Sequence, residues 1–317
     1  MKALRWTEDA LALHEVATPT PTVDEARVRV SLAGVCATDL EIVRGYMGFS
    51  GTLGHEFVGV VDECSDARWV GQRVCADINL ACGVCADCNV GNSHHCKVRS
   101  VLGIVQRDGA FADHVAVTTR NLVAVPDVVS DDAAVFAEPL AAAFQILEQV
   151  SIDANTRVLV LGDGRLGLLC ALVLAQHGCQ LTVGGRHERK LAIARHAGAL
   201  VTTNVDEIDF DVVVEATGSA SGLAEALDRV RPRGTIVLKS TFADRPDVDT
   251  NRIVVDEIHV VGSRCGPMDK AVAALAEGRI DPTPLIDARF SLTDGPQAIA
   301  KAGESGVLKV LIQPSSA

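Results

Sequence analysis

The chain has 317 residues, 48 % of them hydrophobic and 22 % charged, and a formal net charge of −12. This length predicts two domains with sizeable cores. The acidic balance argues against nucleic acid or an anionic membrane surface as a partner and favours a small-molecule ligand. No run approaches the ~18–20 apolar residues of a membrane helix, and the start lacks an apolar signal segment. Together with scattered cysteines, this predicts a cytoplasmic protein.

Short Val-rich segments separated by Gly, Asp and Pro follow one another over the first 130 residues, and predict a β-rich amino-terminal domain. These segments are 28–35, 57–63, 73–78, 112–118 and 122–126. Residues 131–150 then predict a helix, with Asp131 and Asp132 near its start. Metal-competent side chains stand at Cys36, His55, Glu56 and Glu138, although a lone Cys or His in a β domain is more often core or surface than ligand.

Four cysteines stand close together at Cys82, Cys85, Cys88 and Cys96, with the spacing C-x2-C-x2-C-x7-C. Four thiolates in one short loop can close a tetrahedral shell around Zn²⁺ and leave no open position, which predicts a structural zinc site. The alternative is a disulfide cluster or free thiols. Closely spaced Cys-x2-Cys repeats outside a secreted scaffold usually bind metal.

After Asn155, strand and helix patterns alternate, which predicts a parallel sheet with helices on both faces. The predicted elements are 157–162, 166–178, 180–185, 188–198, 211–218, 222–230 and 235–240. We interpret 252–262 as a further strand near the sheet edge. The tail from 263 contains one predicted helix, 268–278, and is expected to return to the first domain.

The sequence G-x-G-x-x-G at 162–167 lies directly after a strand and opens a helix, as dinucleotide binding requires. Gly162 permits the tight turn, Gly164 lets the backbone approach a pyrophosphate, and Gly167 allows close packing of strand and helix. The helix amino terminus then offers free N–H groups to the phosphates. The alternative is a glycine turn that holds no ligand.

The end of the second strand of this predicted sheet indicates which dinucleotide binds. Gly185 stands where an acidic residue would accept hydrogen bonds from the ribose of NAD, and Arg186 follows it. A 2′-phosphate would find cations here and no carboxylate, so we predict NADP(H) in preference to NAD(H). Lys190 is included among the cofactor-binding residues, although Arg189 and Lys190 also suit a solvated helix face.

Taken in order, these motifs resemble the zinc-dependent medium-chain dehydrogenase/reductase superfamily over nearly the whole chain. The motifs are Cys36-x2-Asp39, Gly54-His55-Glu56, the four-cysteine loop, Glu138-Pro139, the glycine turn and Glu215-Ala216-Thr217-Gly218. In having glutamate before this proline, the chain resembles the polyol, sugar and threonine dehydrogenase branch of the superfamily. The resemblance implies an α/β protein with a GroES-like domain (1–139), a Rossmann domain (140–262) and a carboxy-terminal segment (263–317) returning to the first.

The resemblance also implies site residues. Cys36 and His55 would be ligands of a catalytic zinc, with Glu56 a third ligand and Glu138 either the fourth or a neighbour that exchanges with it. Thr38 would pass the substrate proton onward, and Asp39 would orient the ligands. With the four-cysteine site, this makes two zinc ions per chain. The implied cofactor contacts are Gly162, Gly164, Arg165, Leu166, Gly167, Gly185, Arg186, Lys190, Thr217 and Lys309.

The predicted function is reversible oxidation of a polyol, sugar or secondary alcohol to a carbonyl, with hydride transfer to NAD(P)⁺ in a homodimer or homotetramer. Tyr46, Phe49 and Phe57 are candidate pocket walls because they lie beside the ligand motifs. Glu41 stands where some alcohol dehydrogenases carry a relay histidine, which leaves the proton route open. Two alternatives are a non-catalytic NADPH-binding protein and a zinc-independent quinone-type reductase.

Overall fold

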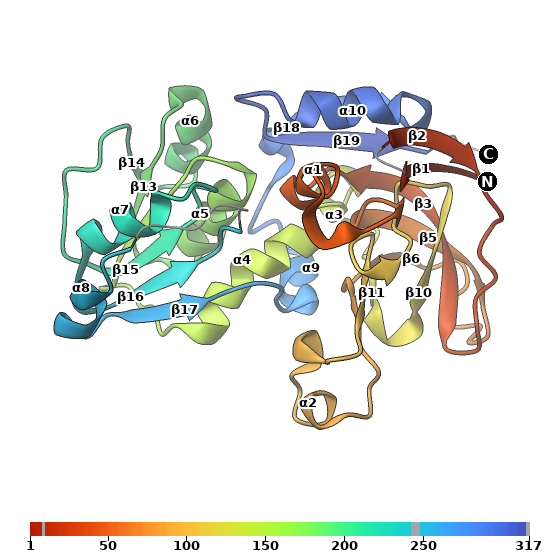
Figure 1. Ribbon diagram of the computed structural model, residues 1–317, viewed down its shortest axis with the longest axis horizontal. Coiled ribbons are helices and arrows are strands. Elements are labelled where there is room, and N and C mark those ends of the chain that lie inside the picture. The colour runs from red at the N-terminus through yellow and green to blue at the C-terminus, as the bar shows by residue number, and fades with distance from the viewer. Residues whose placement is uncertain (8–9, 242–247, 315–317) are drawn as a thin grey trace. The chain divides into compact units, whose positions relative to one another are not determined.

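The computed structural model describes residues 1–7, 10–241 and 248–314 (Figure 1). The chain divides into two compact units, the first formed by Met1–Glu138 and Val272–Ala317 and the second by Pro139–Ala271. The division after Glu138 is one residue from the boundary we predicted, whereas 263–271 belongs to the second unit and not to the carboxy-terminal segment.

The first unit is built on a seven-stranded sheet in the order β11-β6-β5-β3-β19-β18, with β10 also paired to β3. Its strands are β3 (Glu25–Gly34), β5 (Glu56–Cys64), β6 (Arg73–Ala76), β10 (His114–Thr118), β11 (Leu122–Ala124), β18 (Ile286–Ser291) and β19 (Lys309–Gln313). β19 runs antiparallel to β3 and places Leu311 opposite Gly34. The carboxy-terminal segment therefore completes a sheet begun near the amino terminus.

Two three-stranded sheets and several short helices complete this unit. The sheets have the orders β2-β1-β4 and β7-β8-β9. Their strands are β1 (Lys2–Thr7), β2 (Ala10–Glu15), β4 (Gly51–Thr52), β7 (Asn79–Leu80), β8 (Ser100–Leu102) and β9 (Gln106–Arg107). The helices are α1 (Ala37–Ile42), α2 (Ala86–Asn89), α3 (Asp131–Ala134) and α10 (Gly295–Ala302), with 3-10 turns at Tyr46–Gly48, Ser93–His95, Thr119–Asn121, Thr283–Leu285 and Leu292–Asp294.

The single helix predicted over 131–150 is wrong in one respect, because the structure divides it into α3 and α4 (Ala137–Gln149). The Ser130 side chain accepts a hydrogen bond from the Ala133 amide and starts α3. Pro139 has no N–H to donate, and its ring would meet the carbonyl of residue 135 in a continuous helix. The break starts a new helix that carries Glu138 in its first turn.

The second unit contains a six-stranded, all-parallel sheet in the order β14-β13-β12-β15-β16-β17. Its strands are β12 (Arg157–Leu161), β13 (Gln180–Gly184), β14 (Leu200–Thr202), β15 (Phe210–Glu215), β16 (Val230–Leu238) and β17 (His259–Gly262), and its helices are α5 (Arg165–His177), α6 (Glu188–His196), α7 (Gly222–Arg229) and α8 (Thr250–Val255). The helix α9 spans Met268–Ala276. This strand order reverses between β12 and β15, and ligands of such sheets bind at the carboxyl ends of the strands there.

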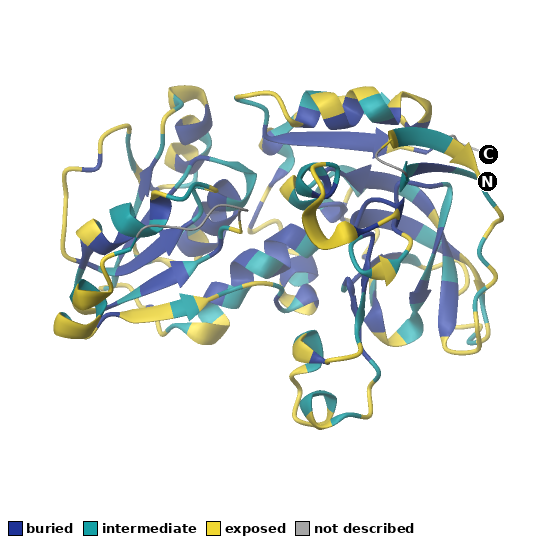
Figure 2. Cartoon of the chain, in the orientation of Figure 1, coloured by how far each residue is buried: buried dark blue, intermediate teal, exposed yellow. Residues whose placement is uncertain are grey.

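The core of the second unit lies on the inner strands, which Figure 2 shows as buried. Leu159, Val213 and Ile236 are fully buried in one cluster on neighbouring strands. Strands that are covered on both faces are expected to be continuously apolar. β17 differs, with mostly exposed residues at the sheet edge.

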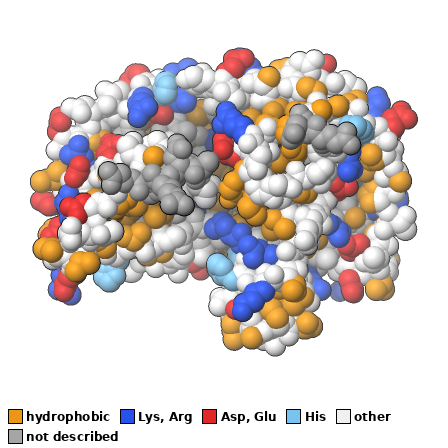
Figure 3. Space-filling view, viewed as in Figure 1, with side chains coloured by type: hydrophobic (Ala, Val, Ile, Leu, Met, Phe, Trp, Pro, Cys, Tyr) orange, Lys and Arg blue, Asp and Glu red, His pale blue; other side chains and the backbone are white. Residues whose placement is uncertain are grey.

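The predicted strand over 252–262 is wrong in its first half, where the structure has α8. Asp249 begins this helix, because its carboxylate accepts a hydrogen bond from the Asn251 amide. Within the described residues, no helix has the length and apolar character needed to cross a membrane. On the face shown in Figure 3, basic and acidic side chains are interspersed.

Candidate active site

The four cysteines of the loop converge on one point. Their sulfur atoms are separated by 3.5 Å (Cys85–Cys88), 3.6 Å (Cys96–Cys82), 3.8 Å (Cys85–Cys96) and 4.0 Å (Cys82–Cys88). Thiolates bound tetrahedrally to zinc at ~2.3 Å lie about 3.8 Å apart, whereas a disulfide needs ~2.0 Å. All four are free thiols. The donor set therefore fits zinc and excludes the disulfide alternative in this structure.

Backbone groups favour a thiolate at Cys82, whereas burial and hydrogen bonds with the other cysteines raise the pKa of Cys88 to about 11. Hydrogen bonds from the amides of Val84 and Cys85 lower the pKa of Cys82 to about 6. Zinc binds the thiolate form of cysteine, so a lowered pKa reduces the cost of removing the proton.

A second potential metal group brings together Cys36, His55 and Glu56, whose ligand atoms all lie within 4.8 Å of one another. Cys36 precedes α1, His55 lies between β4 and β5, and Glu56 begins β5. His55 and Glu56 are buried, while Cys36 is partly exposed. One sulfur, one imidazole and one carboxylate are a donor set that zinc accepts. Cys36 and His55 are about 20 residues apart in the sequence. They lie close together because the start of β5 is near α1.

Asp39 connects the two segments that carry these ligands. Its carboxylate accepts one hydrogen bond from the Cys36 amide at 2.8 Å and another from the Gly54 amide at 3.2 Å. One of its oxygens also lies 3.5 Å from Nδ1 of His55. Asp39 is fully buried. The carboxylate therefore holds both segments together beside the ring of His55.

The charge of His55 depends on these neighbours. Burial alone would lower its pKa, but Asp39 and Cys36 together raise the pKa of His55 well above its usual range. A bound cation would instead require the neutral ring, because a metal and a proton compete for the same nitrogen.

Glu56 has a buried partner that we did not predict. Its carboxylate forms an ion pair with the ammonium of Lys309, and both side chains are only 1 % exposed. Lys309 also donates to the carbonyl of Val35 at 3.3 Å and lies 5.4 Å above the ring of Phe136. The cofactor role of Lys309 remains a prediction; here its charge compensates that of Glu56. Only the pairing of β19 with β3 brings position 309 to this place.

Glu138 and Thr38 lie in the same unit as the three ligands, but outside their group. Burial raises the pKa of Glu138 to about 7, and the charge of Glu56 acts in the same direction. The Thr38 hydroxyl lies 3.7 Å from the sulfur of Cys36. Glu41, at the position of the relay histidine, forms an ion pair with Arg44 at 2.7 Å instead.

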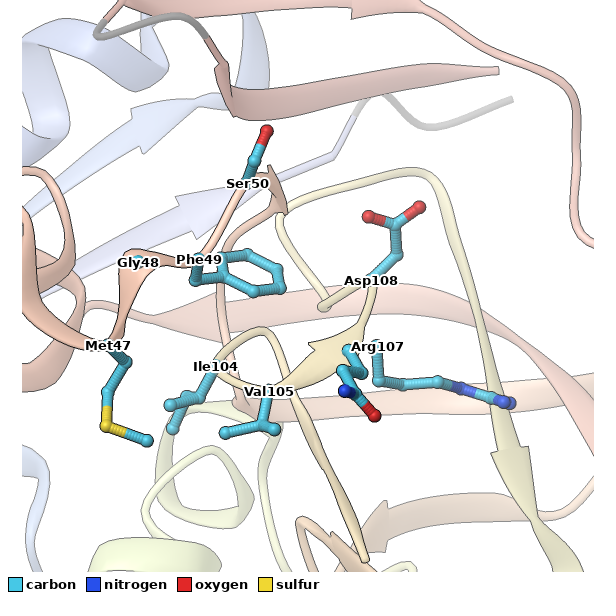
Figure 4. Close-up of a pocket in the computed structure, with 9 residues that line it drawn as sticks. Met47, Gly48, Phe49, Ser50, Ile104, Val105, Arg107 and Asp108 are labelled. Carbon is cyan, nitrogen blue, oxygen red and sulfur yellow. The ribbon is translucent and has the colours of Figure 1, made fainter.

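A pocket of about 610 Å³ lies in the first unit (Figure 4), and its lining includes none of the three ligands. It is lined by Met47, Gly48, Phe49, Ser50, Ile104, Val105, Gln106, Arg107 and Asp108. Gly103 comes before the lining residue Ile104 and packs against Gly54, which comes before His55. Of the aromatic walls we predicted, Phe49 lines this pocket, Tyr46 is 40 % exposed, and Phe57 is buried in the core.

The glycine turn of the second unit has the close approaches that its sequence requires. Gly162 has φ +116°, and a Cβ there would overlap the carbonyl of Ala216. A Cβ on Gly167 would overlap the backbone of Gly162. Gly164 begins α5 and has nothing within 4 Å of its Cβ position. Arg165 and Leu166 are the first residues of this helix. The open space in front of its amino terminus fits a pyrophosphate.

Known protein families match both units of this chain. The alcohol dehydrogenase GroES-like domain family matches residues 22–127, and the glucose dehydrogenase C-terminus family matches residues 132–279. The chain is 31 % identical to the starvation-sensing protein RspB of Escherichia coli, over 92 % of this chain and 91 % of that one. The chain belongs to the zinc-dependent medium-chain dehydrogenase superfamily. This confirms the predicted family, the fold class and the enzyme class, an NAD(P)-dependent alcohol dehydrogenase.

Other members of the superfamily are similar over the full length. Sorbitol dehydrogenase of Halalkalibacterium halodurans is 29 % identical over 99 % of both chains. A solved zinc-binding dehydrogenase of Sinorhizobium meliloti, bound to NADP, has a TM-score of 0.90 at 28 % identity, with 99 % of both chains covered. A solved RspB alcohol dehydrogenase of Escherichia coli, complexed with NADH, has a TM-score of 0.91 at 29 % identity over 99 % of both chains.

Of the remaining predicted cofactor residues of this dehydrogenase, Thr217, Gly185 and Arg186 follow the carboxyl ends of parallel strands, whereas Lys190 lies on a helix. Thr217 follows β15 and donates its hydroxyl to the buried carboxylate of Glu215 at 2.6 Å. Gly185 and Arg186 follow β13, and Arg186 is exposed, whereas Lys190 is buried on α6. These positions surround the strand ends where a dinucleotide binds in such a sheet.

Proposed function

We propose that this dehydrogenase oxidises a neutral polyol or a related secondary alcohol reversibly to the carbonyl compound, with NADP⁺ as hydride acceptor and two zinc ions per chain. The observation that carries the proposal is the ligand group of Cys36, His55 and Glu56, organised by Asp39, in a chain that also has a complete dinucleotide turn. A non-catalytic NADPH-binding protein would gain nothing from such a buried group.

The first unit supplies the groups that handle the substrate. Cys36 and His55 would hold the zinc ion, which acts when bound as a Lewis acid toward the substrate hydroxyl. Thr38 lies beside Cys36 and would accept the hydroxyl proton and pass it on. Glu138, with its pKa near 7, is suited to take up that proton or to exchange as a ligand.

Glu56 is a candidate third ligand in competition with Lys309. As long as the carboxylate remains with the lysine ammonium, the metal position that it would take stays available to substrate or water. A catalytic zinc needs such an open position. We therefore propose that Glu56 or Glu138, but not both at once, joins Cys36 and His55.

We propose that the pocket in Figure 4 receives the substrate, in which case its lining favours an uncharged, hydroxylated one. Met47, Ile104 and Val105 offer apolar surface on one side, and Ser50 and Asp108 offer polar groups. The only guanidinium among the lining residues, that of Arg107, is already paired with Glu25. A phosphorylated sugar alcohol would need a cation that this part of the described structure does not offer. The similarity to a sorbitol dehydrogenase agrees with a neutral polyol.

We propose NADP(H) as the preferred cofactor because position 185 carries no acidic side chain and Arg186 supplies an exposed guanidinium. Similar structures hold NADP in one case and NADH in another, so the fold alone does not decide between them. We also propose a cytoplasmic location, which suits ten unpaired cysteines, and a homodimer or homotetramer that pairs through the edge strand β17.

The test is the absorbance of reduced nicotinamide after zinc-loaded protein is mixed with NADP⁺ or NAD⁺ and one of several substrates. The panel contains neutral polyols, their phosphate esters, simple secondary alcohols and threonine, with zinc content measured on the same sample. We expect two zinc ions per chain and turnover of a neutral polyol, faster with NADP⁺. Turnover of phosphate esters alone would contradict the substrate class. One zinc ion and no turnover would favour the non-catalytic alternative.

A further inference from the structure

The middle residue of the dinucleotide turn, Asp163, has contacts that our sequence prediction did not anticipate. It follows Gly162 at the end of β12, yet its carboxylate reaches the end of the neighbouring strand β13. There it accepts hydrogen bonds from the amide of Arg186 at 2.8 Å and from the amide of His187 at 2.6 Å. It also lies 3.0 Å from Nδ1 of the His187 ring. Asp163 is only 7 % exposed.

These contacts explain why position 185 is glycine. A Cβ at Gly185 would lie 2.6 Å from Cβ of Asp163 and 2.8 Å from one of its carboxylate oxygens. Such distances do not occur between real side chains, so Asp163 and any side chain at 185 exclude each other. The acidic residue that usually stands at the end of the second strand to bind the ribose is thus replaced by a carboxylate that comes from the turn.

The carboxylate is ionised and already has its hydrogen-bond donors. Burial alone would raise the pKa of Asp163, but the hydrogen bonds from His187 and Arg186 outweigh it and hold the pKa below its usual value. Two backbone amides and one ring nitrogen occupy most of its acceptor positions. A ribose hydroxyl would have to compete with all three donors.

Unlike the carboxylate of Asp163, the guanidinium of Arg186 has no partner among the residues that the structure describes. Its backbone amide is fixed by Asp163, while its side chain is exposed and makes no hydrogen bond or ion pair with the residues that the structure describes. A planar guanidinium of this kind matches the geometry of a phosphate. The ring of His187, on the same turn, already lies 3.0 Å from the carboxylate of Asp163.

We propose that Asp163 sets the cofactor preference by positioning, since it holds the 185–187 turn in the conformation that presents Arg186 to the 2′-phosphate of NADP(H). The inference rests on the proposed preference for NADP(H) and adds a residue that touches no part of the reaction. The turn is thereby preorganised, so binding does not have to order it. Asp163 is then a positioning residue, and Arg186 is the group that contacts the phosphate.

The test is the binding of NADPH and NADH, followed by fluorescence without substrate, in the zinc-loaded wild-type protein and four variants. R186Q removes the phosphate contact, D163A removes the anchor, and D163N keeps one acceptor oxygen of the same shape. R195Q is the matched control, because Arg195 is also an exposed arginine on the neighbouring helix, paired with Glu188. We expect NADPH to bind about tenfold or more weakly in R186Q and D163A, less weakly in D163N, and unchanged in R195Q, with NADH little affected throughout.

Different failures lead to different conclusions. If the wild-type protein prefers NADH, or if R186Q leaves NADPH binding unchanged, the cofactor preference itself is wrong. If R186Q weakens NADPH binding but D163A weakens both dinucleotides equally, Asp163 is merely structural and the positioning role is overturned. If D163N and D163A tighten NADPH binding, the carboxylate repels the 2′-phosphate and acts as the ribose acceptor of an NAD-type site. Circular dichroism of each variant identifies loss of folding.

Discussion

The buried carboxylate of Asp39 offers the most direct test of how the proposed catalytic metal group of Cys36, His55 and Glu56 is held together. D39N keeps the size and shape of the side chain and one acceptor oxygen, but replaces the other with an amide that donates. Either the Cys36 amide or the Gly54 amide then loses its acceptor, and the negative charge beside His55 disappears.

The expected magnitude follows from that loss. A hydrogen bond to a charged group is worth about 1.5–3 kcal/mol, and each 1.4 kcal/mol corresponds to a factor of about ten in an equilibrium constant. Zinc at Cys36 and His55 should therefore bind ~10- to 100-fold more weakly. Loss of a residue that hydrogen-bonds to the metal-binding segments usually lowers metal affinity by this amount.

The assay is chelator competition, in which the zinc content of the folded protein is measured against increasing concentrations of a zinc-binding dye. In D39N one zinc ion per chain should leave at about 10- to 100-fold lower chelator concentration, while the zinc of the four-cysteine loop stays. The matched control is D153N in the second unit, since Asp153 likewise accepts hydrogen bonds from two backbone amides. An unchanged competition curve for D39N would refute the reasoning, because it would mean that the ligand segments hold their positions without Asp39.

Four further substitutions test separate parts of the structure. C36S should leave one zinc ion per chain and no turnover, whereas C85S should remove the loop zinc; metal analysis would contradict this assignment if either variant kept both ions. G54A should destabilise the protein by about 1–3 kcal/mol more than G45A, because both have φ above +90° but only the new Cβ of G54A overlaps Phe111; equal urea midpoints would argue against that contact. D211N should lose stability at pH 7 and show a shallower decline below about pH 4. Hydrogen bonds to Asp211 hold its folded pKa below the unfolded value, so its contribution is present above the unfolded pKa and lost as pH falls; parallel pH profiles would count against it.

Much of this architecture was predictable because its determinants are local. The glycine turn at 162–167 combines close packing and an open helix end within six residues, so its spacing between a strand and a helix predicts a dinucleotide site. The four cysteines also lie within one loop, and their spacing suffices to close a tetrahedron. Hydrophobic runs such as that of β12 identify buried parallel strands, because both faces are covered.

Two predicted elements were wrong because one residue determines where a helix begins or ends. The valines of 252–255 suit a strand, but the cap supplied by Asp249 starts a helix there. Pro139 interrupts what composition presents as one helix. In both cases one residue, an aspartate or a proline, outweighs the secondary-structure preference of the residues around it.

The chain's sequence by itself determined the family, the two kinds of domain and the side chains of the two groups that could hold a metal, since each depends on residues a few positions apart or on motifs in a given order. Tertiary structure alone decided which charges face one another. β19 crosses to β3 and delivers Lys309 to Glu56, 253 residues away, and β12 lies beside β13, so that Asp163 fills the space above Gly185. Pairing of this kind depends on strand order in a sheet, which no local pattern encodes.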